Sequence, residues 1–60
     1  MIDAVNNKGH TALHLAVMHD HIDVVEVLLR YGADRYIEDA DGKIPQDYAA
    51  QDSLMHNLLE

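Results

Sequence analysis

Apolar residues return at helical spacing in three segments of the chain. The first segment predicts a short helix over about residues 11–19, because its apolar positions fall one turn apart on a single stripe formed by Leu13, Ala16 and Val17. The second predicts a helix over about residues 22–31, whose face toward the first helix comprises Val24, Val25, Leu28 and Leu29. The same spacing recurs near the end of the chain in Leu54, Met55, Leu58 and Leu59. The predicted fold class is therefore all-α.

Capping and turn residues separate these segments. Thr11 and Ser53 each precede an apolar stripe and are good N-caps, since a hydroxyl oxygen can accept a hydrogen bond from a backbone N–H of the first turn. Asp20 lies between the first two helices, where an aspartate tolerates left-handed backbone better than most residues. Gly32 ends the second helix, and Pro45 fits the first turn of a further short one.

The chain also resembles itself at an offset of 33 residues. Gly9 then falls on Gly42, and Ala16 falls on Ala49. Self-similarity at this period indicates a stacked-repeat protein. Residues 1–60 are accordingly predicted to form one domain, in which residues 1–5 end a preceding hairpin, residues 6–38 form a full repeat and residues 39–60 form a short terminal repeat.

Residues 6–34 resemble the ankyrin repeat, with a glycine turn, a Thr-Ala-Leu-His helix start at Thr11 and a Gly-Ala-Asp end at Gly32. The second copy keeps the glycine, proline and alanine but loses the threonine and histidine. The resemblance implies two helix-turn-helix pairs joined by hairpin-like loops. It also implies that His14 bonds the Thr11 hydroxyl and nearby backbone, and that His21 bridges backbone groups of adjacent repeats. The structural motif residues are Gly9, Thr11, His14, His21, Gly32 and Gly42.

Composition narrows the possible functions. The chain has 4 Lys and Arg against 11 Asp and Glu, a formal net charge of −7, so a phosphate backbone would be repelled and nucleic acid is not an expected partner. There is no cysteine, no apolar run long enough to span a membrane and no signal peptide at the start. A cytoplasmic or nuclear location is the expectation, with no membrane partner.

The five histidines do not predict a metal site. His10 and His14 have the spacing of a two-histidine zinc face, but His10 precedes the helix cap. His19 and His21 straddle a helix end and are expected to point apart. We therefore expect no metal and no cofactor.

Nothing in the sequence predicts catalysis. The only aliphatic hydroxyls belong to Thr11 and Ser53, which are assigned to helix caps. Asp39 and Asp41 are expected to lie in a turn open to water, where nothing would separate their pKa values. The chain is accordingly interpreted as non-enzymatic.

The ankyrin resemblance implies a protein-binding module whose partner lies along the loop tips and the exposed end of the first helix of each repeat. Met18 is the most promising contact, because a flexible apolar side chain adapts to a partner. Tyr36 is either a partner anchor or a packing substitute. The candidate partner-binding residues are Asn7, Lys8, His10, Met18, His19, Tyr36, Ala40, Asp41, Lys43, Gln51 and Asp52.

Two other functions remain open. The chain could be a self-associating or array-capping fragment, since the first helical pair is expected to present Leu15 or Val27 toward a neighbour and so to favour a homo-oligomer. Alternatively, His10, His19 and neighbouring groups could form a metal or pH sensor. The identity of any protein partner cannot be read from the sequence.

Overall fold

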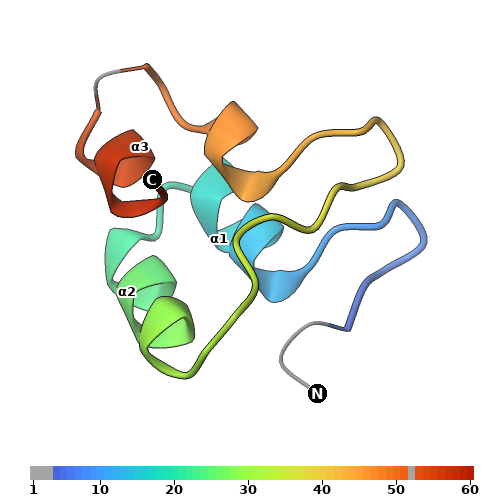
Figure 1. Ribbon diagram of the computed structural model, residues 1–60, viewed down its shortest axis with the longest axis horizontal. Coiled ribbons are helices and arrows are strands. Elements are labelled where there is room, and N and C mark those ends of the chain that lie inside the picture. The colour runs from blue at the N-terminus through green and yellow to red at the C-terminus, as the bar shows by residue number, and fades with distance from the viewer. Residues whose placement is uncertain (1–3, 52) are drawn as a thin grey trace.

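The computed structural model describes residues 4–51 and 53–60, and the all-α prediction is confirmed for them: they contain four helices and no strand (Figure 1). In chain order these are α1 (Ala12–Met18), α2 (Ile22–Arg30), the 3₁₀-helix η1 (Pro45–Tyr48) and α3 (Leu54–Leu58). None of the helices in the described part of the chain is long and apolar enough to cross a membrane.

The helices form two pairs that stack against each other. The first pair is α1 with α2 and the second is η1 with α3; η1 packs on α1 (Figure 1). A loop precedes the first helix of each pair, and the two loops project side by side from the same edge of the molecule. We call them the first tip (residues 6–10) and the second tip (residues 39–43).

Local hydrogen bonds set the helix starts. The Thr11 hydroxyl accepts from the His14 backbone N–H at 3.3 Å, and the Ser53 hydroxyl accepts from the His56 N–H at 3.0 Å. Between α1 and α2 the chain turns through Asp20, whose φ is 58°, and the His21 N–H donates to the Ala16 carbonyl at 2.9 Å. Asp20 thus adopts the left-handed backbone that an aspartate tolerates better than most residues.

The core lies between the two helical pairs. Its buried apolar residues come from α1, α2, α3 and the loop after α2: Leu13, Ala16, Val17, Val25, Ala33, Met55 and Leu59. Leu28 and Leu29 are half-buried against this cluster, as the apolar spacing predicts.

Two residues that the apolar spacing assigned to core-facing helix faces are exposed in the structure, so that prediction is wrong for them. Val24 is 44% exposed and Leu54 is 65% exposed. Successive helical residues point about 100° apart, so Val25 takes the core-facing position on α2 and Val24 turns away from it. In α3, which has five residues, Met55 and the following Leu59 reach the core, and Leu54 does not.

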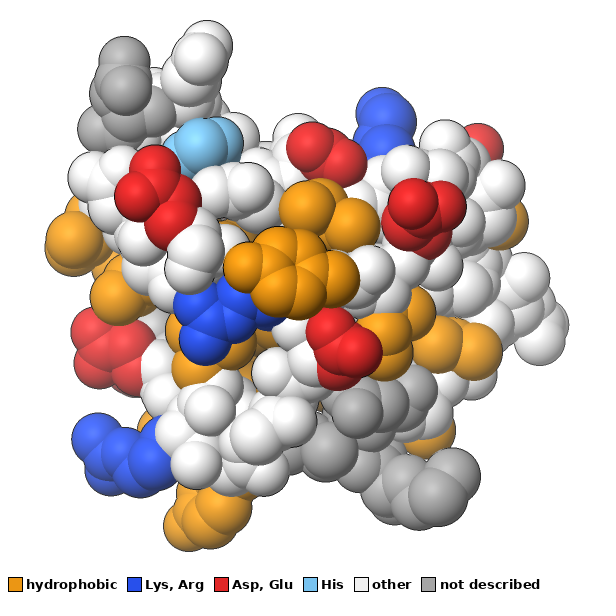
Figure 2. All heavy atoms as spheres, viewed as in Figure 1, with side chains coloured by type: hydrophobic (Ala, Val, Ile, Leu, Met, Phe, Trp, Pro, Cys, Tyr) orange, Lys and Arg blue, Asp and Glu red, His pale blue; other side chains and the backbone are white. Residues whose placement is uncertain are grey.

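The molecular surface carries apolar side chains between acidic ones, as the face in Figure 2 shows. Val24 and Val27 of α2 and its C-cap residue Tyr31 lie about one turn apart and form an exposed apolar stripe, with Val27 46% exposed. Leu15 on α1 is 37% exposed. Leu15 and Val27, one of which was expected to face a neighbour, are thus both partly exposed.

Candidate functional site

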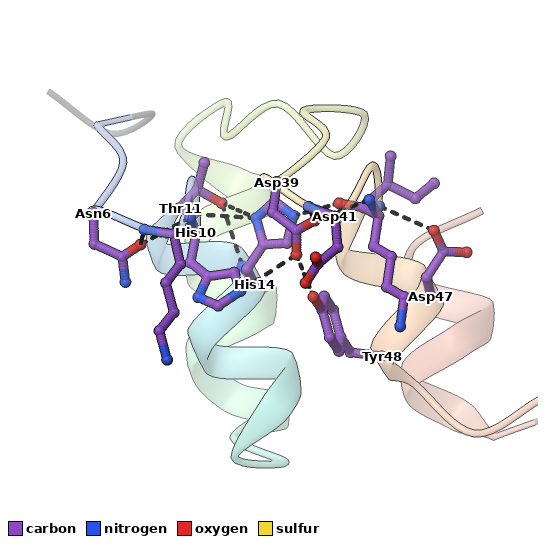
Figure 3. Close-up of polar contacts among 11 residues, drawn as sticks. Asn6, His10, Thr11, His14, Asp39, Asp41, Asp47 and Tyr48 are labelled. Carbon is purple, nitrogen blue, oxygen red and sulfur yellow. Dashed lines mark hydrogen bonds and ion pairs between the residues drawn. The ribbon is translucent and has the colours of Figure 1, made fainter.

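The two tips have the same backbone turn. In the first tip the Asn6 N–H donates to the His10 carbonyl at 3.0 Å, and in the second the Asp39 N–H donates to the Lys43 carbonyl at 2.8 Å. A side-chain oxygen closes each turn from inside. Asn6 Oδ1 accepts the N–H groups of residues 8 and 10 at 2.9 and 3.0 Å, and Asp39 Oδ1 accepts those of residues 41 and 43 at 2.9 and 3.0 Å (Figure 3).

Backbone contact joins one tip to the other. The Ala40 N–H donates to the Lys8 carbonyl at 3.0 Å. At Gly9, which has φ +77°, an added Cβ would lie 2.8 Å from the Ala40 nitrogen and 3.1 Å from Asp39 Cα. Glycine therefore serves two needs here, the left-handed turn and the close approach of the second tip.

His14 connects α1 to the second tip. Its Nε2 lies 2.9 Å from the Lys43 carbonyl oxygen, which can only accept, so Nε2 carries the proton. Its Nδ1 then accepts the Thr11 backbone N–H at 3.1 Å and contacts the Thr11 hydroxyl at 2.9 Å (Figure 3). Both ring nitrogens are thus occupied within the fold.

The expectation that Asp39 lies in a turn open to water is wrong. Asp39 is 7% exposed, and its Oδ2 accepts a hydrogen bond from the Tyr48 hydroxyl and lies 3.3 Å from His10 Nε2. The Tyr48 hydrogen bond is the main cause that lowers the pKa of Asp39 to about 2; burial opposes it, and the backbone N–H groups of Lys43 and Asp41 reinforce it.

The same contact raises the pKa of Tyr48 to about 12, first because the phenolic proton is donated to a carboxylate and then because of burial. The Tyr48 ring also meets the rings of His10 and His14, each with centroids 6.0 Å away, and lies under the Lys43 ammonium at 5.6 Å. Asp39 and Tyr48 therefore hold the first tip, the second tip and η1 together, a role that neither residue showed in the sequence.

An open cavity of about 390 Å³ lies beside the first tip and α1, and we call it the groove. Four of the candidate partner-binding residues line it: Asn7, Lys8, His10 and Met18. Sequence reasoning did not assign Asn6 and Leu15 to this surface, although both line the groove as well. Their positions gave a usable signal, because Asn6 begins the tip and Leu15 lies one turn before Met18.

His10 is less accessible than its assignment to a partner surface assumed. Its side chain is 11% exposed, since the ring packs against Tyr48 and Asp39 while it borders the groove. Only a small part of the His10 ring is therefore accessible in the groove.

The other candidates among the described residues do not border the groove. His19, Ala40, Asp41, Lys43 and Gln51 are exposed elsewhere, and Asp52 lies outside the described residues. Tyr36 is exposed, and its backbone N–H donates to Asp34 Oδ1 at 2.8 Å. One set of candidates thus gathers around the groove from the first tip and α1, and the other described candidates lie on the second tip or elsewhere on the chain.

The structure corrects the expectations for His19 and His21. Their rings do not point apart: the centroids are 5.9 Å from each other, because Asp20 turns the chain sharply between them. The His21 side chain is exposed and makes no bridging hydrogen bond to described backbone groups. Within the described residues, no group of three or more histidine, cysteine, aspartate or glutamate side chains could hold a metal ion.

Comparison with known proteins identifies the repeat. The family model described as Ankyrin repeat matches residues 8–40. The chain is 42% identical over 59 residues to the Inhibitor of Bruton tyrosine kinase of Xenopus laevis, 37% over 57 residues to Regulatory protein SWI6 of Saccharomyces cerevisiae and 36% over 58 residues to Ankyrin repeat protein nuc-2 of Neurospora crassa. These matches cover 95%, 95% and 97% of this chain, but 4%, 7% and 5% of the relatives.

Proposed function

The chain belongs to the ankyrin repeat family, and on that premise we propose that it is a non-catalytic module that binds a protein partner through its tips and the groove. Ankyrin repeats are in general protein–protein interaction modules. The observation that carries the proposal is the gathering of Asn7, Lys8, His10 and Met18 around one cavity on a surface held by backbone contacts.

A fixed surface of this kind favours binding. The Ala40–Lys8 hydrogen bond, the His14–Lys43 hydrogen bond and the buried Asp39 position the tips before any partner arrives. Less conformational freedom is then lost on association, so more of the contact energy contributes to affinity. Met18 supplies an apolar, adaptable contact within this rigid frame.

The proposal is tested by selecting binders from a random peptide library displayed on phage and mapping the selected peptides by NMR chemical shifts. We expect the largest shifts at the amides around the groove. Met18→Glu should weaken binding at least tenfold, whereas Leu54→Glu, which places the same charge on an exposed helical position, should leave it unchanged. Circular dichroism checks that both variants are folded. Peptides that map elsewhere, or that bind both variants as well as the wild type, would contradict the proposal.

A second candidate function is self-association, which the exposed stripe of Val24, Val27 and Tyr31 favours. Covering apolar surface contributes about 25 cal/mol per Å², so a few hundred Å² would matter to a small fold. If copies associate through this stripe, the melting temperature rises with protein concentration, and Val27→Glu abolishes that dependence. A melting temperature independent of concentration excludes this candidate.

A further inference from the structure

We propose that the groove selects partner segments in which a carboxylate side chain stands next to a bulky apolar one. This inference rests on the proposed function, because it specifies the chemistry of a partner bound at that surface. Its support comes from the kinds of groups that line the groove, the way each is fixed and the charge of the remaining chain.

The groove has an apolar side and a polar side. Leu15 and Met18 lie one turn apart on α1 and form the apolar side, with Leu15 37% exposed. Asn6, Asn7 and Lys8 of the first tip form most of the polar side. No aspartate or glutamate of the described residues lines it, although the chain carries 11 acidic residues and a net charge of −7. The described lining of the groove thus differs in charge from the chain as a whole.

Hydrogen bonding within the tip leaves donors on the polar side. Asn6 Oδ1 already accepts two backbone N–H groups, so the part of the amide left for a partner is its NH₂ group, which only donates. The Lys8 ammonium likewise only donates. A partner that matches these groups must bring acceptors, and a carboxylate also brings the complementary charge.

Lys8 is the one of the four Lys and Arg residues that lines the groove, whereas Arg30 is exposed on α2 and does not line it. Arg35 donates to the Leu58 and Glu60 carbonyls, and the Lys43 ammonium lies over the Tyr48 ring. Lys8 contributes its backbone N–H and carbonyl to the tip, whereas its ammonium forms no ion pair in the described part of the chain. Its main chain is therefore fixed, and its charge is left for a partner.

Asp39, the carboxylate that contacts the groove residue His10, does not cancel this preference. Asp39 is buried, and its two oxygens receive the backbone N–H groups of Asp41 and Lys43, the Tyr48 hydroxyl and the contact with His10. Its negative charge is thereby compensated from several sides. A partner carboxylate meets Lys8 and Asn6 at the first tip.

The experiment uses peptides selected against the wild-type chain whose chemical shifts map to the groove. Each is synthesised in pairs, one with its acidic residue and one with the corresponding amide, and the two dissociation constants are compared. We expect acidic residues beside leucine, isoleucine or phenylalanine in the selected peptides. We expect the acidic member of each pair to bind about two- to fivefold more tightly at low salt, which is the range for exposed ion pairs. In about 0.5 M NaCl this preference should shrink, because added salt screens the attraction between exposed charges.

A matched pair of variants separates a local contact from the overall charge. Lys8→Gln and Arg30→Gln remove the same unit of positive charge, but Arg30 is exposed on α2 and does not line the groove. Lys8→Gln should make the acidic and amide peptides bind equally, and Arg30→Gln should leave the preference intact.

The outcomes are distinguishable. Groove-binding peptides without acidic residues, or equal loss of preference in both variants, would overturn the inference while the proposed function stands. The absence of any groove-binding peptide would overturn both. If dilution of the chain alone shifts the groove amides, a second copy occupies the groove, and the carboxylate partner is rejected.

Discussion

Gly9 is where the two tips touch, and replacing it with alanine measures how much that contact stabilises the fold. An added Cβ would lie 2.8 Å from the Ala40 nitrogen, 3.1 Å from Asp39 Cα and 3.2 Å from the Asp39 carbonyl carbon. All three are backbone atoms of the second tip, so no side chain can rotate out of the way. The first tip must separate from the second or the turn at Gly9 must change.

The magnitude follows from two terms and a matched control. Gly9 and Gly42 have nearly the same φ, +77° and +75°, but a Cβ at Gly42 meets nothing within 4 Å. Left-handed backbone costs alanine about 1–2 kcal/mol at either position, and forcing extra volume into a packed site adds about 1–3 kcal/mol. We therefore expect Gly42→Ala to lose about 1–2 kcal/mol of unfolding free energy and Gly9→Ala about 2–5 kcal/mol.

Urea unfolding followed by circular dichroism gives both free energies. In a domain of this size each kcal/mol lowers the melting temperature by about 4–8 °C, so thermal unfolding resolves the difference as well. Hydrogen exchange adds a local measurement, since the Ala40 N–H that donates to Lys8 should lose protection in Gly9→Ala and keep it in Gly42→Ala. Equal losses of stability in Gly9→Ala and Gly42→Ala would show that the two tips do not pack as described. The groove would then not be held in place by contact between the tips.

Three further predictions concern the core, the caps and the buried carboxylate. Leu13→Ala should lose about 2–5 kcal/mol in urea melts, because Leu13 is buried, whereas the exposed Leu54→Ala should change stability by less than about 0.5 kcal/mol. His14→Ala should lose about 1–3 kcal/mol by leaving buried partners unpaired, while His19→Ala should lose less than about 0.5 kcal/mol; similar losses would contradict the hydrogen bonds assigned to His14. The pKa of Asp39 falls from 3.8 to about 2 on folding, so its charged form stabilises the fold above pH 3.8, and this stabilisation is lost as pH falls through about 2. The urea midpoint of the wild type should therefore fall over this pH range, and the fall should be smaller in Asp39→Asn.

Sequence reasoning located the helices because their signals are local. The spacing of Leu13, Ala16 and Val17 gave α1 to within about one residue at each end, and Thr11 and Ser53 cap the helices they were assigned to. The 33-residue offset gave the repeat, since each copy carries its own turn and apolar stripe. Features of this kind are fixed by residues within a few positions of one another.

The same reasoning failed where burial depends on which side of a helix meets the next pair. Val24 and Val25 are adjacent apolar residues, and the spacing of apolar positions alone does not decide which of them is buried, although only Val25 is. In the folded chain α2 packs on α1 with Val25 buried in the core and Val24 exposed. Leu54 was misassigned for a similar reason, because α3 is too short for every apolar residue of its pattern to reach the core.

Asp39 was missed because its surroundings come from distant parts of the chain. Locally it is a polar residue in a turn, and such residues are usually open to water. His10 reaches it from 29 positions earlier, and Tyr48 reaches it from η1. A buried carboxylate requires several donors at once, and only the stacked arrangement of the two tips brings them together.

The two tips contain residues whose side chains the stack requires and a residue, Lys8, whose side chain it does not require. Lys8 supports the first tip only through its main chain, by an N–H that donates to Asn6 and a carbonyl that accepts from Ala40. Any residue other than proline supplies both groups, so the stack sets no requirement on the side chain at this position. The stack does require the side-chain chemistry of Gly9 and Asp39. Gly9 must lack a Cβ, and Asp39 must offer a carboxylate, both oxygens of which accept hydrogen bonds. Position 8 can therefore change its chemistry, and with it the partner that we propose the groove selects, without a change in the fold that presents it.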